Sequence, residues 1–232
     1  MSLADDLRSQ VAKFYAEQWT TRDGQKVPEA DEVRLGNDAV RLDGTVLYAD
    51  LVESTKLVSD RQASLAAEVY KAFLYCAAKV VEAEGGVVTA YDGDRLMAVF
   101  VGDLKNSSAA RAALKITWCM RELVSPLAKK QYPTLNLEDF RQVTGIDTSS
   151  LFVARTGARA ANDLVWIGRA ANFAAKLSEI RDGGSAAYVT SDVFSVLSTE
   201  AKISSDGRPM WEPRTWSYNQ MTIYRSSWQW TP

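Results

Sequence analysis

The chain contains no histidine, and this absence removes several common catalytic arrangements at once. Serine–histidine–aspartate and cysteine–histidine nucleophiles are excluded, as are metal sites with imidazole ligands. Only two cysteines are present, Cys76 and Cys119; both fall in helical patterns, so we expect buried, unreactive thiols. Catalysis by this chain would therefore use carboxylates, lysine, arginine, hydroxyl groups and metal ions bound through oxygen.

Long hydrophobic runs and an excess of one charge are also missing. No apolar stretch reaches the roughly 18 residues that span a bilayer, and the acidic N-terminus lacks a signal-peptide pattern. The formal net charge of −2 gives no electrostatic reason to expect nucleic-acid binding. We therefore expect a cytoplasmic protein that binds neither membrane nor nucleic acid. With 232 residues, 47% of them hydrophobic, the chain suits one globular domain with extensions.

Hydrophobic periodicity predicts alternating helices and strands. We expect helices near residues 4–19, 62–84, 106–124 and 169–181, the third of them capped within residues 106–108. We expect strands near residues 43–50, 141–147, 151–156 and 221–226, and two more within residues 87–100, on either side of a hairpin turn at Asp92-Gly93. This order favours an α+β fold in which helices pack on a mostly antiparallel sheet.

The ends of the chain differ in character from its middle. Residues 1–40 read as an N-terminal helical extension, and residues 41–232 as one domain. The last segment is rich in tryptophan, with Trp211, Trp216, Trp228 and Trp230. A membrane anchor or a carbohydrate platform would use such residues, but the interleaved charges favour packing against the core or a partner subunit.

Two aspartates lie at the ends of strongly apolar strand patterns. Asp50 ends the run at residues 46–50, and Asp94 follows the Asp92-Gly93 turn. Each could be an ordinary turn or helix-start residue. If the two strands are neighbours, however, both carboxylates converge, and with a backbone carbonyl such as that of Leu51 they form an oxygen-only site suited to Mg²⁺ or Mn²⁺.

Two further segments could complete a nucleotide site. A helix that starts near Ser54 and Thr55 would direct unpaired backbone N–H groups and two hydroxyls toward a phosphate beside Asp50. Asn172 and Lys176 are four residues apart and share one helix face. A carboxamide and an ammonium there could hold a ribose and a developing phosphoryl charge, although any helix can carry such a pair by chance.

Together these segments resemble the catalytic domain of class III nucleotidyl cyclases. Residues 48–55 are similar to the family's first metal motif, and Gly93-Asp94 with residues 96–100 to its second. Gly145 to Thr148 are similar to a core-strand motif, and Gly168 with Asn172, Ala174 and Lys176 to the helix that stabilises the transition state. The resemblance covers about residues 40–226.

The resemblance implies a ferredoxin-like cyclase fold and a head-to-tail homodimer whose active sites draw on both chains. Asp50, Leu51 and Asp94 would bind two Mn²⁺ or Mg²⁺ ions in one subunit, and the other would supply Asn172 and Lys176. The ribose 3′ oxygen would attack the α-phosphate of a nucleoside triphosphate and release diphosphate.

Departures from the family pattern concern the base and the phosphates. The positions that read adenine in adenylate cyclases are Ala90 and Val165, whose side chains form no hydrogen bonds. A smaller base would fit, with Tyr48 as a contact, although Tyr48 could also be a core residue. Lys176 replaces the usual arginine, so Arg169 is a candidate to assist it. Arg214 is a weak candidate for the terminal phosphates.

The pattern is most similar to the bacterial pyrimidine cyclases of anti-phage defence. It therefore implies conversion of UTP to cyclic UMP, a messenger for a separate antiviral effector that needs no direct contact with the cyclase. A cytidylate cyclase, a purine cyclase with an atypical pocket, and a non-catalytic nucleotide-binding domain remain alternatives.

Overall fold

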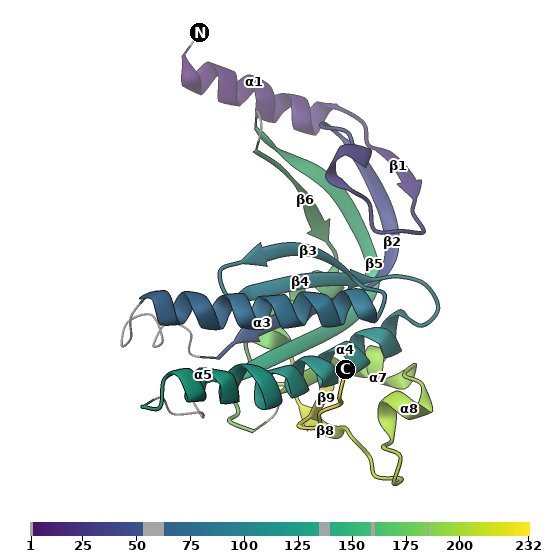
Figure 1. Ribbon diagram of the computed structural model, residues 1–232. Helices are drawn as coiled ribbons and strands as arrows, with labels where there is room; N and C mark the ends of the chain where they lie inside the picture. The colour runs from purple at the N-terminus through teal and green to yellow at the C-terminus, as the bar shows by residue number, and fades with distance from the viewer. Residues whose placement is uncertain (1, 53–62, 135–139, 159–160, 185) are drawn as a thin grey trace.

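Two long antiparallel strands form the centre of the molecule in the computed structural model, which describes residues 2–52, 63–134, 140–158, 161–184 and 186–232. They are β2 (Asp38–Leu51) and β5 (Gln142–Ala158), paired in register from Ala39 opposite Ala154 to Leu51 opposite Gln142. Aliphatic and β-branched residues fill β2, and such residues favour a pleated, buried surface. Figure 1 shows both strands running through the molecule.

The sheet is mostly antiparallel, as the sequence predicts. Its path is β3-β4-β2-β5-β7-β9-β8, while β1 pairs with β2 and β6 pairs with β5 outside this path. The pairs β1–β2 and β5–β7 are parallel. The other strands are β1 (Thr20–Asp23), β3 (Val87–Asp92), β4 (Arg95–Phe100), β6 (Ala161–Ile167), β7 (Ala187–Thr190), β8 (Glu212–Thr215) and β9 (Thr222–Ser226).

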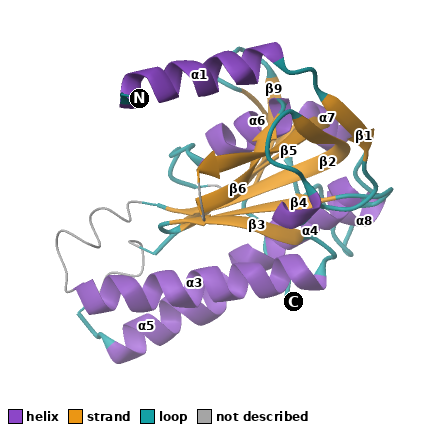
Figure 2. Cartoon of the chain, turned by 90° about the horizontal axis from the view of Figure 1, so that it is seen from above, coloured by secondary structure: helices purple, strands orange, loops and turns teal. Residues whose placement is uncertain are grey.

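Helices cover both faces of the sheet. They are α1 (Leu3–Ala16), α3 (Ala63–Ala83), α4 (Lys105–Trp118), α5 (Ser125–Gln131), α6 (Arg169–Ser178), α7 (Ser191–Ser195) and α8 (Thr199–Lys202), with a 3₁₀ turn η1 (Ala30–Glu32) and a π-helical turn η2 (Cys119–Val124). Figure 2 shows α3, α4 and α5 on one side of the sheet and α6 on the other.

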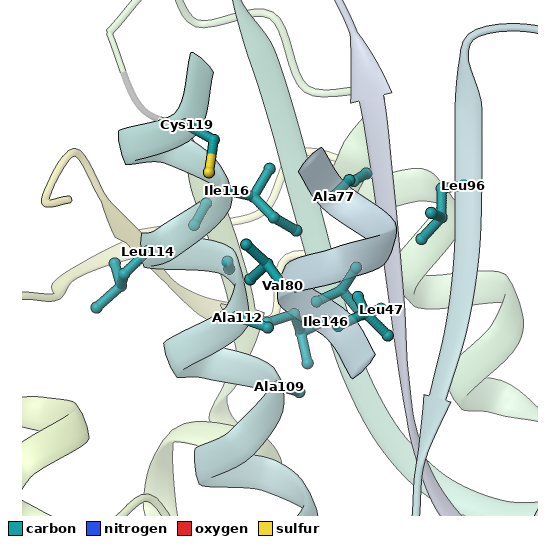
Figure 3. Packing of buried hydrophobic residues seen from close by; sticks show 14 of the residues in the cluster. Leu47, Ala77, Val80, Leu96, Ala109, Ala112, Leu114, Ile116, Cys119 and Ile146 are labelled. Carbon is teal, nitrogen blue, oxygen red and sulfur yellow. The ribbon is translucent and has the colours of Figure 1, made fainter. Parts of the chain in front are cut away.

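The main core lies between the sheet and the pair α3 and α4. Leu47 and Leu96 of the sheet, Val80 of α3 and Ile116 of α4 are buried in one cluster (Figure 3). Small residues on the facing sides of the helices, among them Ala109, let the backbones approach closely. Because side chains alternate along a strand, Leu47, Ala49 and Leu51 face this core, while Tyr48 and Asp50 face α6.

Helix α6 packs closely against β5 at Gly145. A Cβ atom on Gly145 would lie 2.2 Å from the carbonyl oxygen of Ala174 and 2.5 Å from the backbone nitrogen of Ser178. Only glycine leaves room for this backbone-to-backbone contact. The contact fixes the height of α6 over the strand, and thereby the position of its outer face.

Several local predictions were wrong. Residues 141–147 and 151–156 are parts of one strand, β5, and its neighbour β6 was not predicted. The polar stretch after α1 contains β1. The expected cap within residues 106–108 is also wrong: α4 begins after Leu104, and Asn106 is buried, where its Oδ1 accepts a hydrogen bond from Thr45 Oγ1 at 2.9 Å.

The cysteines differ from the expectation as well. Cys119 is buried, but Cys76 is only partly buried. A hydrogen bond from the Cys119 thiol lowers the pKa of the Cys76 thiol.

The two chain ends adopt different environments. Helix α1 starts with a capping box in which Ser2 Oγ accepts a hydrogen bond from the Asp5 N–H, and no α1 residue is buried. Trp211 and Trp216 are buried, and Trp228 and Trp230 pack on the main core, so the tail covers the domain as predicted. Of the helices within the described ranges, none has the length and apolarity needed to cross a bilayer.

Candidate active site

Asp50 and Asp94 lie at the same edge of the sheet. Strands β2 and β4 are antiparallel neighbours, and Asp50 is paired in register with Arg95. Asp94 directly precedes Arg95, in the turn that joins β3 to β4. The condition on which the metal-site hypothesis depends, that the two strands are neighbours, is therefore met.

The Asp50 carboxylate is largely removed from water. Its side chain is 13% exposed, and Oδ2 accepts a hydrogen bond from Arg181 Nη2 at 2.9 Å. Burial raises the pKa of Asp50; Arg181 opposes this effect, and the nearby charge of Asp94 adds to it. A buried carboxylate with a second carboxylate beside it is a costly arrangement unless a cation compensates it.

The Asp94 carboxylate is incompletely satisfied. Its Oδ2 is buried, and among the described residues it has no hydrogen-bond partner. A buried polar atom of this kind usually marks the place of an ion or a functional group. The described residues contain no group of three or more acidic or cysteine side chains that could hold a metal. Two carboxylates with a backbone carbonyl nearby, as at Leu51, nevertheless match the hard oxygen ligands of Mg²⁺ and Mn²⁺.

Ser54 and Thr55 lie outside the described residues, as does the helix expected to start there. The described part of β2 ends at Leu51, and Val52 follows it; the N–H of Val52 donates to the carbonyl of Arg141 at 2.8 Å.

Asn172 and Lys176 project from the exposed face of α6. Asn172 Nδ2 donates to the carbonyl of Gly168 at 3.2 Å, and Lys176 Nζ lies 4.4 Å from the centre of the Tyr218 ring. Lys176 also lines an open hollow of about 440 Å³ together with Arg181. No described hydrogen bond or ion pair links Asn172 or Lys176 with the two aspartates. Both residues are exposed.

Arg169 is bound to the protein itself. Its Nε lies 3.0 Å from Asp147 Oδ2, and its Nη2 donates to the Thr148 carbonyl at 2.8 Å and to Asp192 at 2.6 Å. Asp147 is fully buried, which raises the pKa of its carboxyl, while hydrogen bonds from Thr190 and Arg169 oppose that rise. This network ties the start of α6 to β5 and α7, and it occupies the guanidinium that we considered for substrate binding.

The expected base-binding residues are spread over three strands. Tyr48 of β2 is half-buried, and burial raises the pKa of its hydroxyl, which therefore stays protonated and can donate a hydrogen bond. The Cζ atom of Arg95 lies 5.5 Å from the centre of the Tyr48 ring. Ala90 of β3 packs with Tyr48 in the cluster beneath α6, and Val165 of β6 is 38% exposed.

Two arginines at this site were not among the residues selected from the sequence. They are Arg95 and Arg181. The sequence offers a weak signal for each: Arg95 follows Asp94 directly, and Arg181 lies just beyond the helix that carries Lys176. Neither signal identifies a partner, because Arg181 is 131 positions from Asp50.

Solved structures share this fold. The adenylyl cyclase CyaB from P. aeruginosa is 20% identical with a TM-score of 0.68, covering 81% of this chain and 95% of that chain. The guanylyl cyclase Cya2 is 16% identical with a TM-score of 0.67, covering 83% and 95%. A bacterial light-regulated adenylyl cyclase is 18% identical with a TM-score of 0.69. The match covers 82% of this chain and 53% of that chain, so this chain spans about half of that protein. The fold is therefore that of class III nucleotide cyclases.

Curated relatives define the family more narrowly. The uridylate cyclase of Xanthomonas perforans is 51% identical over 99% of both chains, and that of Burkholderia cepacia is 43% identical over 100% of both. The uridylate cyclase of Rhodovulum sp. (strain MB263) is 38% identical over 98% of this chain and 97% of its own. No protein-family model matches the chain. The chain belongs to the uridylate cyclase family.

Proposed function

We propose that the protein is a uridylate cyclase that converts UTP to 3′,5′-cyclic UMP and diphosphate. The observation that carries the proposal is the carboxylate pair of Asp50 and Asp94, with a buried Asp94 oxygen that lacks a described partner. It occurs in a chain that is 51% identical, over 99% of its length, to the uridylate cyclase of Xanthomonas perforans.

The two aspartates and the Leu51 carbonyl would hold Mn²⁺ or Mg²⁺, two ions in each site. Such ions, when bound, lower the pKa of the ribose 3′ hydroxyl and neutralise phosphate charge. The chain's own contribution is to fix both carboxylates at the end of the β2–β4 pair. Ser54 and Thr55 would cradle the phosphates next to Asp50.

Asn172 and Lys176 would act across a head-to-tail homodimer, each serving the site of the other subunit. The Asn172 amide would orient the ribose, and the Lys176 ammonium would stabilise the charge that develops on the α-phosphate. Lysine offers a point charge rather than the bidentate fork of arginine. Arg169 would position this helix through its bonds to Asp147 and Asp192 rather than contact the substrate.

Base selection would depend on size and on hydrogen-bond donors. The side chains of Ala90 and Val165 form no hydrogen bonds, so these two positions cannot recognise the polar groups of a purine base. Arg95 lies over Tyr48, and a guanidinium only donates hydrogen bonds. Uracil presents an acceptor oxygen at C4 where cytosine presents an amino donor, which favours UTP over CTP.

The test is incubation of the purified protein with each of the four ribonucleoside triphosphates and Mn²⁺. We expect cyclic UMP as the main product. If cyclic CMP or a purine cyclic nucleotide is the main product, the uridylate cyclase proposal is wrong and the enzyme is a cyclase of the corresponding triphosphate. Absence of any cyclic product from folded dimeric protein would indicate a non-catalytic nucleotide-binding domain.

The product would act as a signal. Cyclic UMP is diffusible, so it could activate a separate antiviral effector without direct contact, as the resemblance to the cyclases of anti-phage defence implies. Phage challenge of cells that carry the wild-type gene or its Asp50→Ala variant, each together with an effector that responds to cyclic UMP, measures this role. Equal protection by both would contradict it.

A further inference from the structure

Arg181 is bound between the candidate metal site and helix α6. Its Nη2 donates to Asp50 Oδ2 at 2.9 Å. Its Nη1 donates to the carbonyl oxygens of Ser178 at 2.6 Å and Ile180 at 3.2 Å. The guanidinium thus connects the metal-site carboxylate with the carboxyl end of the helix that carries Lys176.

The ion pair between Arg181 and Asp50 offsets part of the negative charge of the carboxylate pair. Within the described residues, Arg181 supplies the ion pair to Asp50, and Asp94 has none. Arg95 is nearby, but its guanidinium donates to Asp92 at 3.3 Å and to Glu179 at 3.4 Å. Arg181 therefore makes the direct neutralising contact at the carboxylate pair, and the charge of Arg95 acts on Asp50 without a hydrogen bond.

Arg181 and a metal ion would compete for the Asp50 carboxylate. A cation coordinated by Asp50 needs a lone pair of that carboxylate, and Oδ2 already accepts the Arg181 hydrogen bond. Asp50 is 13% exposed and fixed in β2, whereas the Arg181 side chain is 36% exposed. The arginine, not the aspartate, is the group with room to move.

We propose that Arg181 is the internal counter-cation of Asp50, displaced when the metal binds and then bound to a phosphate oxygen of the substrate. Its bonds to the carbonyls of Ser178, at the end of α6, and of Ile180, just beyond it, keep the guanidinium beside the site after it leaves Asp50. The planar fork of an arginine suits a phosphate oxygen as well as a carboxylate. The second part of this proposal, binding of Arg181 to a substrate phosphate, rests on the proposed function. The first part, competition between Arg181 and the metal ion, does not.

The first test measures Mn²⁺ binding to the metal-free, full-length protein without nucleotide, by electron paramagnetic resonance of free Mn²⁺. We expect Arg181→Ala to bind Mn²⁺ about three- to tenfold more tightly than the wild type, because no guanidinium has to be displaced. Arg181→Lys, which keeps the charge without the fork, should lie between the two. Unchanged or weaker binding by both variants overturns the proposal.

A matched control is Arg141→Ala. Arg141 and Arg181 both line a second, smaller pocket of about 140 Å³, but the Arg141 guanidinium donates to the Gly183 carbonyl at 2.9 Å. Its Mn²⁺ affinity should equal that of the wild type. Circular dichroism checks that all variants are folded, and a purely structural role of Arg181 would weaken metal binding rather than tighten it.

The second test measures calorimetric binding, at saturating Mn²⁺, of a UTP analogue that cannot cyclise because its α,β-bridging oxygen is replaced by a methylene group. We expect Arg181→Ala to weaken this binding about tenfold, because a charge-assisted phosphate contact is lost. An unchanged affinity of Arg181→Ala for the UTP analogue would overturn the proposed contact between Arg181 and the phosphate. The wild-type protein could make no cyclic nucleotide while Arg181→Ala still binds Mn²⁺ more tightly. In that case the proposed function is wrong, but the competition between Arg181 and the metal ion for Asp50 is supported.

Discussion

Asp50 is largely buried and one oxygen of Asp94 is buried, and the described ion pair at this site is that of Asp50 with Arg181. Their burial makes the metal-free protein less stable than it would be with neutral residues, since like charges repel and desolvation penalises each. Functional sites commonly carry such a cost. Stability and metal binding should therefore respond in opposite ways to loss of one charge.

Asp94→Asn should show this opposition. The amide keeps the shape of the side chain and removes its charge. We expect the metal-free variant to be as stable as the wild type or more stable by about 1 kcal/mol. Mn²⁺ should raise the melting temperature of the wild type but not of the variant.

Thermal denaturation with and without Mn²⁺ measures both effects. Asp92→Asn, on the exposed side of the same hairpin, is the control and should keep the metal response. An equal Mn²⁺ shift in Asp94→Asn and in the wild type would contradict the metal site.

The Cys76 thiol should be reactive near neutral pH. Its pKa is lowered to about 7 by a hydrogen bond from Cys119, so the thiolate fraction rises as pH increases through that value. Alkylation by iodoacetamide, followed by mass spectrometry, should be half-maximal in rate near pH 7. Cys119→Ala should move the midpoint toward the ordinary value of 9.0. A midpoint that stays the same in this variant would show that the hydrogen bond is not the cause.

At the scale of elements, the position of α6 depends on the absence of a side chain at Gly145. Gly145→Ala would place a methyl group 2.2 Å from the Ala174 oxygen, a backbone atom that yields only if the whole helix shifts. We expect a loss of about 2–3 kcal/mol in the free energy of unfolding. Cyclase activity should fall as well, because Asn172 and Lys176 move with the helix.

Urea denaturation and the cyclase assay test this prediction. Gly184→Ala is the control, because a Cβ there meets no atom within 4 Å. Equal stability of the two variants would mean that α6 adjusts to the extra methyl group without cost.

At the scale of the whole molecule, the question is whether one chain completes a site. The aspartates lie at the end of the β2–β4 pair, while Asn172 and Lys176 lie on the outer face of α6. Asp50→Ala and Lys176→Ala should each abolish most activity on their own. Co-expressed in equal amounts, they should recover about a quarter of the wild-type activity, since half of the dimers are mixed and each has one intact site.

Differential tags on the two variants confirm that mixed dimers form. Recovery requires that the two residues act in trans. If the isolated mixed dimer is as inactive as either parent, Asp50 and Lys176 serve the same chain's site, and the open hollow lined by Lys176 and Arg181 is where they meet.

The local pattern of the chain determined the type of chemistry and most of the elements. The absence of histidine, the carboxylates at strand ends and the Asp92-Gly93 turn are properties of neighbouring residues, so they are readable without a fold. The same holds for the Thr190 side chain, which caps α7 by accepting from the Val193 N–H. Element boundaries failed where tertiary contacts outweighed local preference, as at Asn106, whose side chain is used by Thr45.

Only the tertiary structure decided which charges meet. Asp50 and Arg181 are 131 residues apart, and Arg169 reaches Asp147 and Asp192 from opposite sides in the chain. No periodic pattern encodes such pairs, because they depend on strand order and on the height of α6 above β5. Burial then sets the strength of the electrostatic interaction in each pair. Water screens these charges in an unfolded chain, whereas the fold excludes water from them.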